Sequence, residues 1–241
     1  MITIMKRAVI SGKYPKFITA LKQLDYEIIK VEPYKDNFDN SEASHADMQI
    51  LNLDNKAIIL LRNNNCFNKK IIDFCQDTST EIIFTDTDIY KFIYPECVKL
   101  NIALVGHYAI GNFKYTDNAV ISILEKYHYE RINVKQGYAK CSTSIVSDGA
   151  IITSDTSIFR AVQGKIDCLK ISEGYISLCE KYGGFIGGAS FLLDKSTLAF
   201  TGDITAHPDY INIKSFCRNH GVDVLSLSKS PLCDVGGAVI I

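Results

Sequence analysis

The sequence predicts an α/β fold: a single-domain α/β propeller, residues 1–241, of five strand-strand-helix-strand modules with pseudo-fivefold symmetry. The first observation is a repeat, because similar segments start at Asp47, Cys141, Gly187 and Cys233, and the last three starts are 46 residues apart. The second is that each of these starts leads into apolar strands. Where the chain continues, a helix and a further strand follow. The third is that one module is split between the two ends of the chain. Repeats of this length are typical of propellers and solenoids.

The split module supplies the first elements of the chain. Alternating apolar residues predict strands at 8–11 and 26–31, and residues 15–24, which begin with a proline, have the apolar spacing of a helix. The missing strand of this module comes from residues 238–241 at the other terminus. Pairing of the two termini would close the propeller and remove its sheet edges. The polar residues 34–44 are expected to form a loop.

The next two modules repeat the order strand, strand, helix, strand. In the module that starts at Asp47 we expect strands at 47–54, 57–60 and 81–84 and a helix at 69–76. In the fainter module near Cys97 we expect strands at 101–105, 111–115 and 129–134 and a helix at 118–127.

The last two modules have the same order. From Cys141 we expect two strands within 141–153, a helix at 156–162 and a strand at 166–171. From Gly187 we expect strands at 187–194 and 198–201, a helix at 210–218 and a strand at 222–227. Asp155 and Asp203 follow the second strands and are expected to cap helices, and Pro208 suits a first helical position.

The composition is that of an ordinary globular protein, with 47% hydrophobic and 22% charged residues. A net charge of −1 argues against nucleic acid or an anionic membrane as a partner and leaves the oligomeric state open. No apolar stretch is long enough to span a membrane, and the N-terminal residues lack the layout of a signal peptide. We therefore expect a cytoplasmic protein.

Eight cysteines are present, at positions 66, 75, 97, 141, 168, 179, 217 and 233. In a cytoplasmic chain of this size, free thiols are favoured over disulfides. Cys75, Cys168 and Cys217 lie within apolar patterns, so we interpret them as core residues. No two cysteines have the C-x-x-C spacing of a zinc site, and the sequence therefore predicts neither a metal nor a cofactor.

The five modules resemble the pentein fold, also called the guanidino-group-modifying fold. Residues 141–153 are similar to the Gly-Gly-Asp strand pair of arginine deiminases and dimethylarginine hydrolases. The resemblance implies that Asp47 lies where these enzymes bind substrate through an Asp, and that Cys233 lies where they carry the nucleophilic Cys. Residues 44–48, 137–141 and 184–190 also resemble an uncharacterised bacterial family of this fold.

The chain departs from the enzyme pattern in two places. The enzymes have a His-x-Asp or His-x-Glu motif where this chain has Gly187-Gly188-Ala189, and they have Gly-Gly-Asp where it has Cys141-Ser142-Thr143. The one His-x-Asp string, at 45–47, lies on another module. These departures favour a non-catalytic binding protein as the alternative to an enzyme. The two glycines themselves are expected to allow close approach of backbone at the axis.

Guanidinium chemistry sets the residue types that a site would need. A planar cation pairs with carboxylates, a thiolate attacks its central carbon, and a histidine transfers protons. Asp47 is expected to bind substrate, and His45, two residues earlier and thus on the same strand face, would carry the proton. The alternative is that His45 only ends the loop before the strand.

Two cysteines compete for the role of nucleophile. Cys141 follows Lys140, whose positive charge would favour the thiolate. Cys233 has Asp234 beside it, which opposes thiolate formation and would point to the other side of a strand. Either thiol could instead be a buried packing residue.

Two functions therefore remain open. The first is a cysteine-dependent hydrolase or transferase that acts on a guanidino or amidino C–N bond in an axial pocket lined by Asp47 and by Cys141 or Cys233. The second is a non-catalytic binding protein of the same fold; a third interpretation is a packed axis, with function at an oligomer surface. The residues assigned to the pocket are the catalytic Cys141, Cys233 and His45 and the substrate-binding Asp47, Lys140, Ser142, Thr143 and Asp234.

Overall fold

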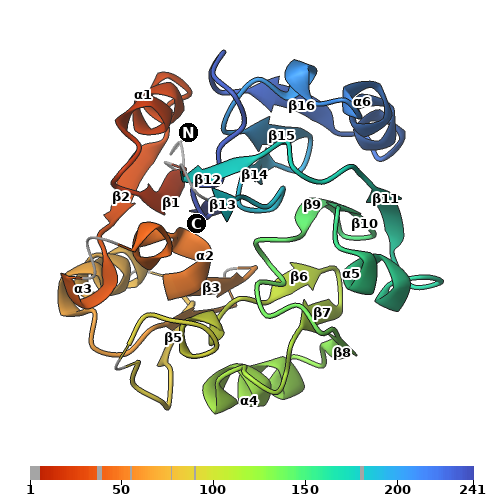
Figure 1. The fold of residues 1–241 in the computed structure, drawn as a ribbon. Coiled ribbons are helices and arrows are strands. Elements are labelled where there is room, and N and C mark those ends of the chain that lie inside the picture. The colour runs from red at the N-terminus through yellow and green to blue at the C-terminus, as the bar shows by residue number, and fades with distance from the viewer. Residues whose placement is uncertain (1–5, 37–39, 55, 77, 90, 180–181) are drawn as a thin grey trace.

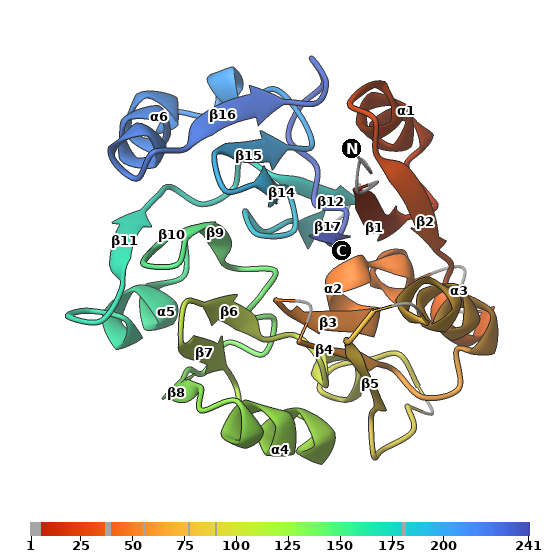
Figure 2. The same cartoon turned by 180° about the vertical axis from the view of Figure 1, so that it is seen from behind.

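The computed structural model describes residues 6–36, 40–54, 56–76, 78–89, 91–179 and 182–241. Its strands form five three-stranded sheets, in each of which an antiparallel pair is extended by a parallel strand. The sheets lie around a common centre, and the chain passes from one to the next in sequence order (Figure 1). Seen from either side, the longer helices lie at the periphery (Figure 2). The predicted α/β class and the five strand-strand-helix-strand units are therefore present.

The split module joins the two ends of the chain. It consists of β17 (Ala238–Ile240), β1 (Arg7–Ser11), α1 (Pro15–Gln23) and β2 (Glu27–Val31). β1 pairs antiparallel with β17, so that Val9 lies opposite Val239, and it pairs in parallel with β2. The predicted pairing of the termini is confirmed.

The second and third units are continuous in sequence. The second consists of α2 (Ala46–Gln49), β3 (Ile50–Leu53), β4 (Ala57–Leu60), α3 (Asn65–Cys75) and β5 (Glu81–Phe84). The third consists of β6 (Ala103–Val105), β7 (Tyr108–Gly111), α4 (Asn118–Lys126) and β8 (Glu130–Asn133). The predicted strand at 111–115 is wrong, because a two-residue turn with Gly106 at φ 57° brings the chain back at Tyr108.

The last two units match the predicted order of elements. One consists of β9 (Ser144–Ser147), β10 (Ala150–Thr153), α5 (Thr156–Ala161) and β11 (Asp167–Lys170). The other consists of β14 (Ser190–Asp194), β15 (Thr197–Phe200), α6 (Tyr210–Asn219) and β16 (Asp223–Ser226). Between the two units lies a hairpin that the sequence did not predict, β12 (Ser177–Cys179) and β13 (Tyr182–Gly183).

Local capping agrees with the sequence in part. The carboxylate of Asp155 accepts hydrogen bonds from the amides of Ser157 and Ile158 at the start of α5. Asp203 caps a short 3₁₀ segment, Ile204–Ala206, through the amide of Thr205. Pro208 precedes α6, which begins at Tyr210, so its predicted place as the first helical residue is wrong. Residues 34–44 form no plain loop, since two 3₁₀ turns, Tyr34–Asp36 and Ser41–Ser44, lie in the described part; residues 37–39 fall outside it.

The first strands of several units begin later than the sequence predicts, at Ile50, Ser144 and Ser190, and Cys233 lies before β17 in an isolated bridge to Ser177. The residues in front of them form turns because their backbone groups bond to turns of other units. The amide of Gly188 donates to the carbonyl of Cys141 (2.9 Å), and the amide of Asp47 donates to the carbonyl of Gly236 (3.3 Å). Asp47 consequently lies in the short helix α2 and His45 just before it, so the two do not share a strand face as predicted.

Apolar side chains fill the spaces between the sheets and the peripheral helices. Cys75 and Cys217 are buried, as predicted, and Cys168 is half-buried. The cysteines whose side chains are described are free thiols; that of Cys179 lies outside the description. No helix among the described residues has the length and apolar character needed to cross a membrane.

Candidate functional site

The turns that precede the first strands meet at the centre of the molecule. There, Sγ of Cys141 donates a hydrogen bond to Oδ2 of Asp47, with 3.1 Å between the two atoms. The two residues are 94 positions apart in the sequence. Asp234 and Lys140 are also close enough for their charges to shift the pKa of Asp47. The folding of five units around one centre therefore creates a cluster that no single segment contains.

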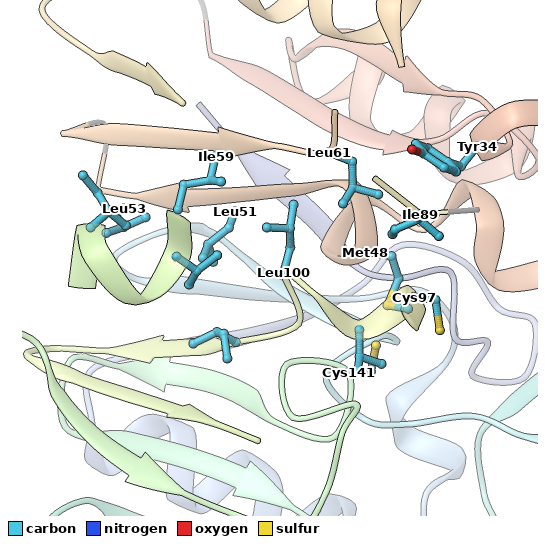
Figure 3. Packing of buried hydrophobic residues seen from close by; sticks show 14 of the residues in the cluster. Tyr34, Met48, Leu51, Leu53, Ile59, Leu61, Ile89, Cys97, Leu100 and Cys141 are labelled. Atoms are coloured by element: carbon cyan, nitrogen blue, oxygen red, sulfur yellow. The ribbon is translucent and has the colours of Figure 1, made fainter. Parts of the chain in front are cut away.

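The thiol of Cys141 is held in a buried hydrogen-bond network. Asn101 donates from Nδ2 to Sγ of Cys141 (3.1 Å), and its Oδ1 accepts from the backbone amides of Lys140 (2.8 Å) and Cys141 (3.2 Å). Figure 3 shows Cys141 beside Met48 and Cys97 at one end of a buried apolar cluster. Burial raises the pKa of the Cys141 thiol well above its usual value, and the negative charges of Asp47 and Asp234 raise it further. The thiol is thus a proton donor in this structure, and the predicted help from Lys140 does not prevail.

Asp47 is 3% exposed, and its Oδ1 has no hydrogen-bond partner among the described residues. Burial raises the pKa of its carboxyl to about 7; the charge of Lys140 lowers this pKa and that of Asp234 raises it. Nζ of Lys140 donates to the carbonyl of Gly187 at 3.2 Å. An uncompensated buried carboxyl favours the approach of a cation, because the cation would supply the missing partner.

Asp234 is the second buried carboxyl of the cluster. Its Oδ2 accepts from the amide of Phe185 (2.9 Å) and its Oδ1 from the amide of Gly236 (3.0 Å). Burial raises the pKa of Asp234 to about 6, and these two amide bonds oppose the rise. A Cβ at Gly188 would clash with this carboxylate, and one at Gly187 would lie 2.3 Å from the backbone carbonyls of Lys140 and Thr143. The predicted close approach of backbone is therefore found at Gly187.

His45 lies beside Asp234 but is not paired with it as an ion. Its Nδ1 is 3.8 Å from Oδ1 of Asp234, which is too long for a hydrogen bond, and its Nε2 has no partner among the described residues. Burial lowers the pKa of His45 to about 4. The imidazole is therefore neutral at physiological pH and has a ring nitrogen available for proton transfer.

Two separate spaces adjoin the cluster where the sequence predicted one axial pocket. The thiol-side space measures about 10 Å³, and the residues that line it are Glu42, His45, Met48, Tyr138, Cys141, Leu178, Phe185 and Asp234. The strand-lined cavity measures about 290 Å³ and extends along the first strands, with Asp47 and Lys140 among its lining residues. Asp47 borders the larger space and Cys141 the smaller, and their hydrogen bond connects the two.

The other predicted site residues do not line either space. Cys233 is half-buried against an apolar cluster of the split module, and burial raises the pKa of its thiol. Asp234 next to it points into the central cluster, in agreement with the expected opposite orientation of the two neighbours. Ser142 and Thr143 are buried, with hydroxyls that lack partners among the described residues. The structure thus brings together His45, Asp47, Lys140, Cys141 and Asp234.

Three residues of the site were missed by the sequence analysis: Asn101, Glu42 and Tyr138. The phenol of Tyr138 donates to Oε2 of Glu42 (3.0 Å), and both side chains line the thiol-side space. Asn101 directly precedes an apolar strand, in the same place in its unit as the predicted site residues, and this position could have identified it. Neither Glu42 nor Tyr138 lies in a pattern that predicts a functional role.

Comparisons with known proteins agree with this architecture. A family model described as "Family of unknown function (DUF6873)" matches residues 9–239. No curated protein matches the sequence.

Solved structures of similar fold include the DDAH from Pseudomonas aeruginosa complexed with citrulline, at 12% identity and a TM-score of 0.56, covering 98% of this chain and 97% of that one. A dimethylarginine dimethylaminohydrolase adduct with S-methyl-L-thiocitrulline has 12% identity and a TM-score of 0.58, covering 93% of both chains. SxtG, an amidinotransferase of the saxitoxin biosynthetic pathway from Microseira wollei, has 11% identity and a TM-score of 0.57, covering 93% of this chain and 79% of that one. At these identities the likeness shows the fold. The chain therefore belongs to the family of unknown function DUF6873 and has the pentein, or guanidino-group-modifying, fold.

Proposed function

We propose that this protein is a cysteine-dependent hydrolase or transferase that acts on a guanidino or amidino C–N bond at the centre of a closed, pseudo-fivefold propeller. The observation that carries the proposal is the buried pair of Asp47 and Cys141, with Asp234 and His45 beside it. The DDAH complexed with citrulline and the amidinotransferase share this fold, which supports a ligand of the guanidino class.

In this proposal the charge of the substrate activates the site. A guanidinium placed between Asp47 and Asp234 would supply the positive charge that the buried carboxyls lack and would lower their pKa values. The same cation would lower the pKa of the Cys141 thiol. A thiol that is inert without substrate then becomes a thiolate when substrate is bound.

The chemical step would begin when Sγ of Cys141 bonds to the central carbon of the guanidino group and its proton passes to Nε2 of His45. The C–N bond then breaks, and the leaving amine takes that proton from His45. Water, or an acceptor amine in a transferase, next attacks the same carbon with His45 as the base. The S–C bond breaks, and the proton returns to the thiol.

The size of the thiol-side space sets one condition on this mechanism. At about 10 Å³ it has room for no more than a single water molecule. A guanidino group could enter only if the aromatic rings of Tyr138 and Phe185, which line the space, moved aside. Rotamer changes of this kind are common when ligands bind.

A second candidate is a non-catalytic protein that binds the same class of cation. The raised pKa of Cys141 and the small space beside it favour this function, since both oppose reaction at the thiol. In that case Cys141 serves only as a hydrogen-bond donor that stabilises the Asp47 carboxylate.

Alkylation by two matched reagents separates the candidates. Chloroacetamidine and chloroacetamide have the same leaving group and nearly the same shape, but only the amidine carries a positive charge. We expect the amidine to alkylate Cys141 at least about tenfold faster, a difference of about 1.4 kcal/mol in activation free energy. Peptide mapping by mass spectrometry identifies the labelled cysteine, with Cys141→Ser as the negative variant and the buried Cys217 as the internal control.

The Asp47→Asn variant should lose the preference for the charged reagent. Equal rates for both reagents in the unaltered protein would contradict the enzyme proposal. Acetamidine has no leaving group and cannot alkylate a thiol. If acetamidine stabilises the protein against heat, while chloroacetamidine alkylates Cys141 no faster than chloroacetamide does, the result would support the binding protein instead.

A further inference from the structure

The strand-lined cavity has the character of a ligand site in its own right. Its walls come from β3, β9, β14 and β17 and from residues 100–104. They are largely aliphatic and include Ile50, Leu100, Ile102, Leu104 and Ile145. A volume of about 290 Å³ lies at the lower end of the range of small-molecule sites. The cavity therefore suits a slender ligand with an apolar middle part.

The charged residues of this cavity are three acids and one base. Asp47 and Lys140 belong to the central cluster, while Asp54 and Asp148 are exposed. Asp47 lines the inner end of the cavity, and its buried Oδ1 has no hydrogen-bond partner among the described residues. Lys140 already donates to the carbonyl of Gly187. The net charge of the lining is negative and favours a cationic ligand.

The acids lie at opposite ends of the cavity. Asp47 precedes β3 and Asp54 follows it, and Asp148 likewise follows β9. β3 has four residues, so the strand alone adds roughly 13 Å, at 3.3 Å per residue, to the path between the inner and outer acids. Asp54 and Asp148 both line the cavity, and each follows the first strand of its unit, so both lie at the outer end. The outer end of the cavity thus has two carboxylates in its lining.

The polar groups of the walls are bonded within the protein. Nδ2 of Asn52 donates to the carbonyl of Ile240 at 3.0 Å. Oγ of Ser190 is 2.6 Å from Oγ of Ser144 and donates to the carbonyl of Ile186 at 2.7 Å. A ligand would therefore find its strongest polar partners at the two acidic ends and apolar contact between them.

We propose that the strand-lined cavity binds a linear organic dication, an aliphatic chain with a positive group at each end. The inner group pairs with Asp47, the chain packs on the aliphatic walls, and the outer group lies between Asp54 and Asp148. The site goes beyond the proposed function, because binding here needs neither the thiol of Cys141 nor any reaction. None of its lining residues lines the thiol-side space, and the hydrogen bond between Asp47 and Cys141 connects the two.

Isothermal titration with simple amines tests the proposal. The probes are the propane, pentane and octane α,ω-diamines, with octylamine as the singly charged and octanediol as the uncharged ligand of matched length. Octanediamine should bind at least about tenfold more tightly than octylamine, which is about 1.4 kcal/mol, and more tightly than the propane homologue. Octanediol should show no binding.

Variants test which acids bind the two ends of the ligand. The double variant Asp54→Asn/Asp148→Asn should bind octanediamine only as tightly as octylamine, and Asp47→Asn should weaken both amines. Asp73→Asn on the outer face of α3 is the matched control and should change neither. Cys141→Ser keeps a hydroxyl that can donate to Asp47 but removes the nucleophile, so it should still bind octanediamine at least about tenfold more tightly than octylamine, which keeps this result separate from the catalytic proposal. No binding of octanediamine, equal affinity for both amines, or an unaffected double variant would each overturn the inference.

Discussion

The thiol of Cys141 donates a hydrogen bond to Oδ2 of Asp47 at the centre of the molecule, across 3.1 Å. The two effects have opposite signs: the Asp47 carboxylate raises the pKa of the thiol, while the hydrogen bond from the thiol lowers the pKa of the carboxyl. The pair can therefore hold one negative charge far more easily than two. A cation bound at this centre would favour a second negative charge on the pair.

Asp47→Asn should make Cys141 a better nucleophile toward an uncharged reagent. Removal of the acid takes away a negative charge that raises the pKa of the thiol, so this pKa should fall, although burial will keep it above its usual value. The measurement is the pH dependence of the alkylation rate with chloroacetamide. A pKa that stays the same or rises in the variant would show that the two side chains are not coupled as the distance implies.

Asn101 connects this pair to the rest of the fold, and its loss should be costly. Asn101→Leu would leave the amides of Lys140 and Cys141 without their acceptor, at about 1–3 kcal/mol for each buried unsatisfied group. We expect the free energy of unfolding in urea to fall by about 2–4 kcal/mol.

Asn112→Ala is the matched control for this prediction. Asn112 donates to the carbonyl of Lys135 in an exposed place, so its loss should cost less than about 1 kcal/mol. Similar losses in both variants would contradict the special role of Asn101.

The sequence predicted the elements that are decided locally. The strand at 81–84 and the cap at Asp155 follow from apolar alternation and from the need to satisfy the first amides of a helix. The residues in front of the first strands, such as 141–143 and 187–189, are predicted to begin strands because the repeat aligns them with one another. Their true conformation depends on backbone bonds such as that from Gly188 to Cys141, between units 47 residues apart. No local sequence pattern predicts such a long-range hydrogen bond.

The candidate site was predictable to the same extent. The repeat predicted that Asp47, Cys141 and Cys233 lie around one centre, because they occupy equivalent positions of their units. In the structure it is Asp234, the neighbour of Cys233, that joins Cys141 and Asp47 there. The repeat could not show that the side chain of Cys233 would turn toward the apolar cluster of the split module. Nor could it show the network of Asn101, which depends on the turn of residues 138–143 being folded back against it.

Gly188→Ala should destabilise the protein strongly and disturb Asp234. The added Cβ would collide with the carboxylate of Asp234, which is fixed by the amides of Phe185 and Gly236 and cannot move aside without leaving both unpaired. We expect a loss of at least about 2 kcal/mol in the free energy of unfolding, the range for buried groups that lose partners.

Gly149→Ala provides the comparison, because nothing lies within 4 Å of a Cβ at that position. Its effect should be small or slightly stabilising. A tolerated Gly188→Ala, with thermal stability equal to that of Gly149→Ala, would mean that Asp234 is not held as the hydrogen bonds indicate.

The pH dependence of stability should contain two opposing contributions from the centre. The pKa of Asp47 is about 7 in the folded protein and about 3.9 in an unfolded chain, so the folded state binds more protons between these values and this contribution to stability falls as the pH rises through them. Asp234, with a pKa of about 6, acts in the same direction. His45 acts in the other: its pKa is about 4 in the folded protein against about 6.5 unfolded, so its contribution rises with pH over that interval.

Single variants separate these contributions in urea unfolding between pH 4 and pH 7. Asp47→Asn removes a falling contribution, so its stability should rise more steeply with pH than that of the unaltered protein. His45→Gln removes the rising one, so its stability should fall with pH relative to the unaltered protein. Since each pKa unit corresponds to about 1.4 kcal/mol, the two curves should diverge by more than the error of the measurement. Curves that run parallel across this interval would show that neither group changes its proton affinity on folding, and the buried acid and imidazole would then be solvated in solution.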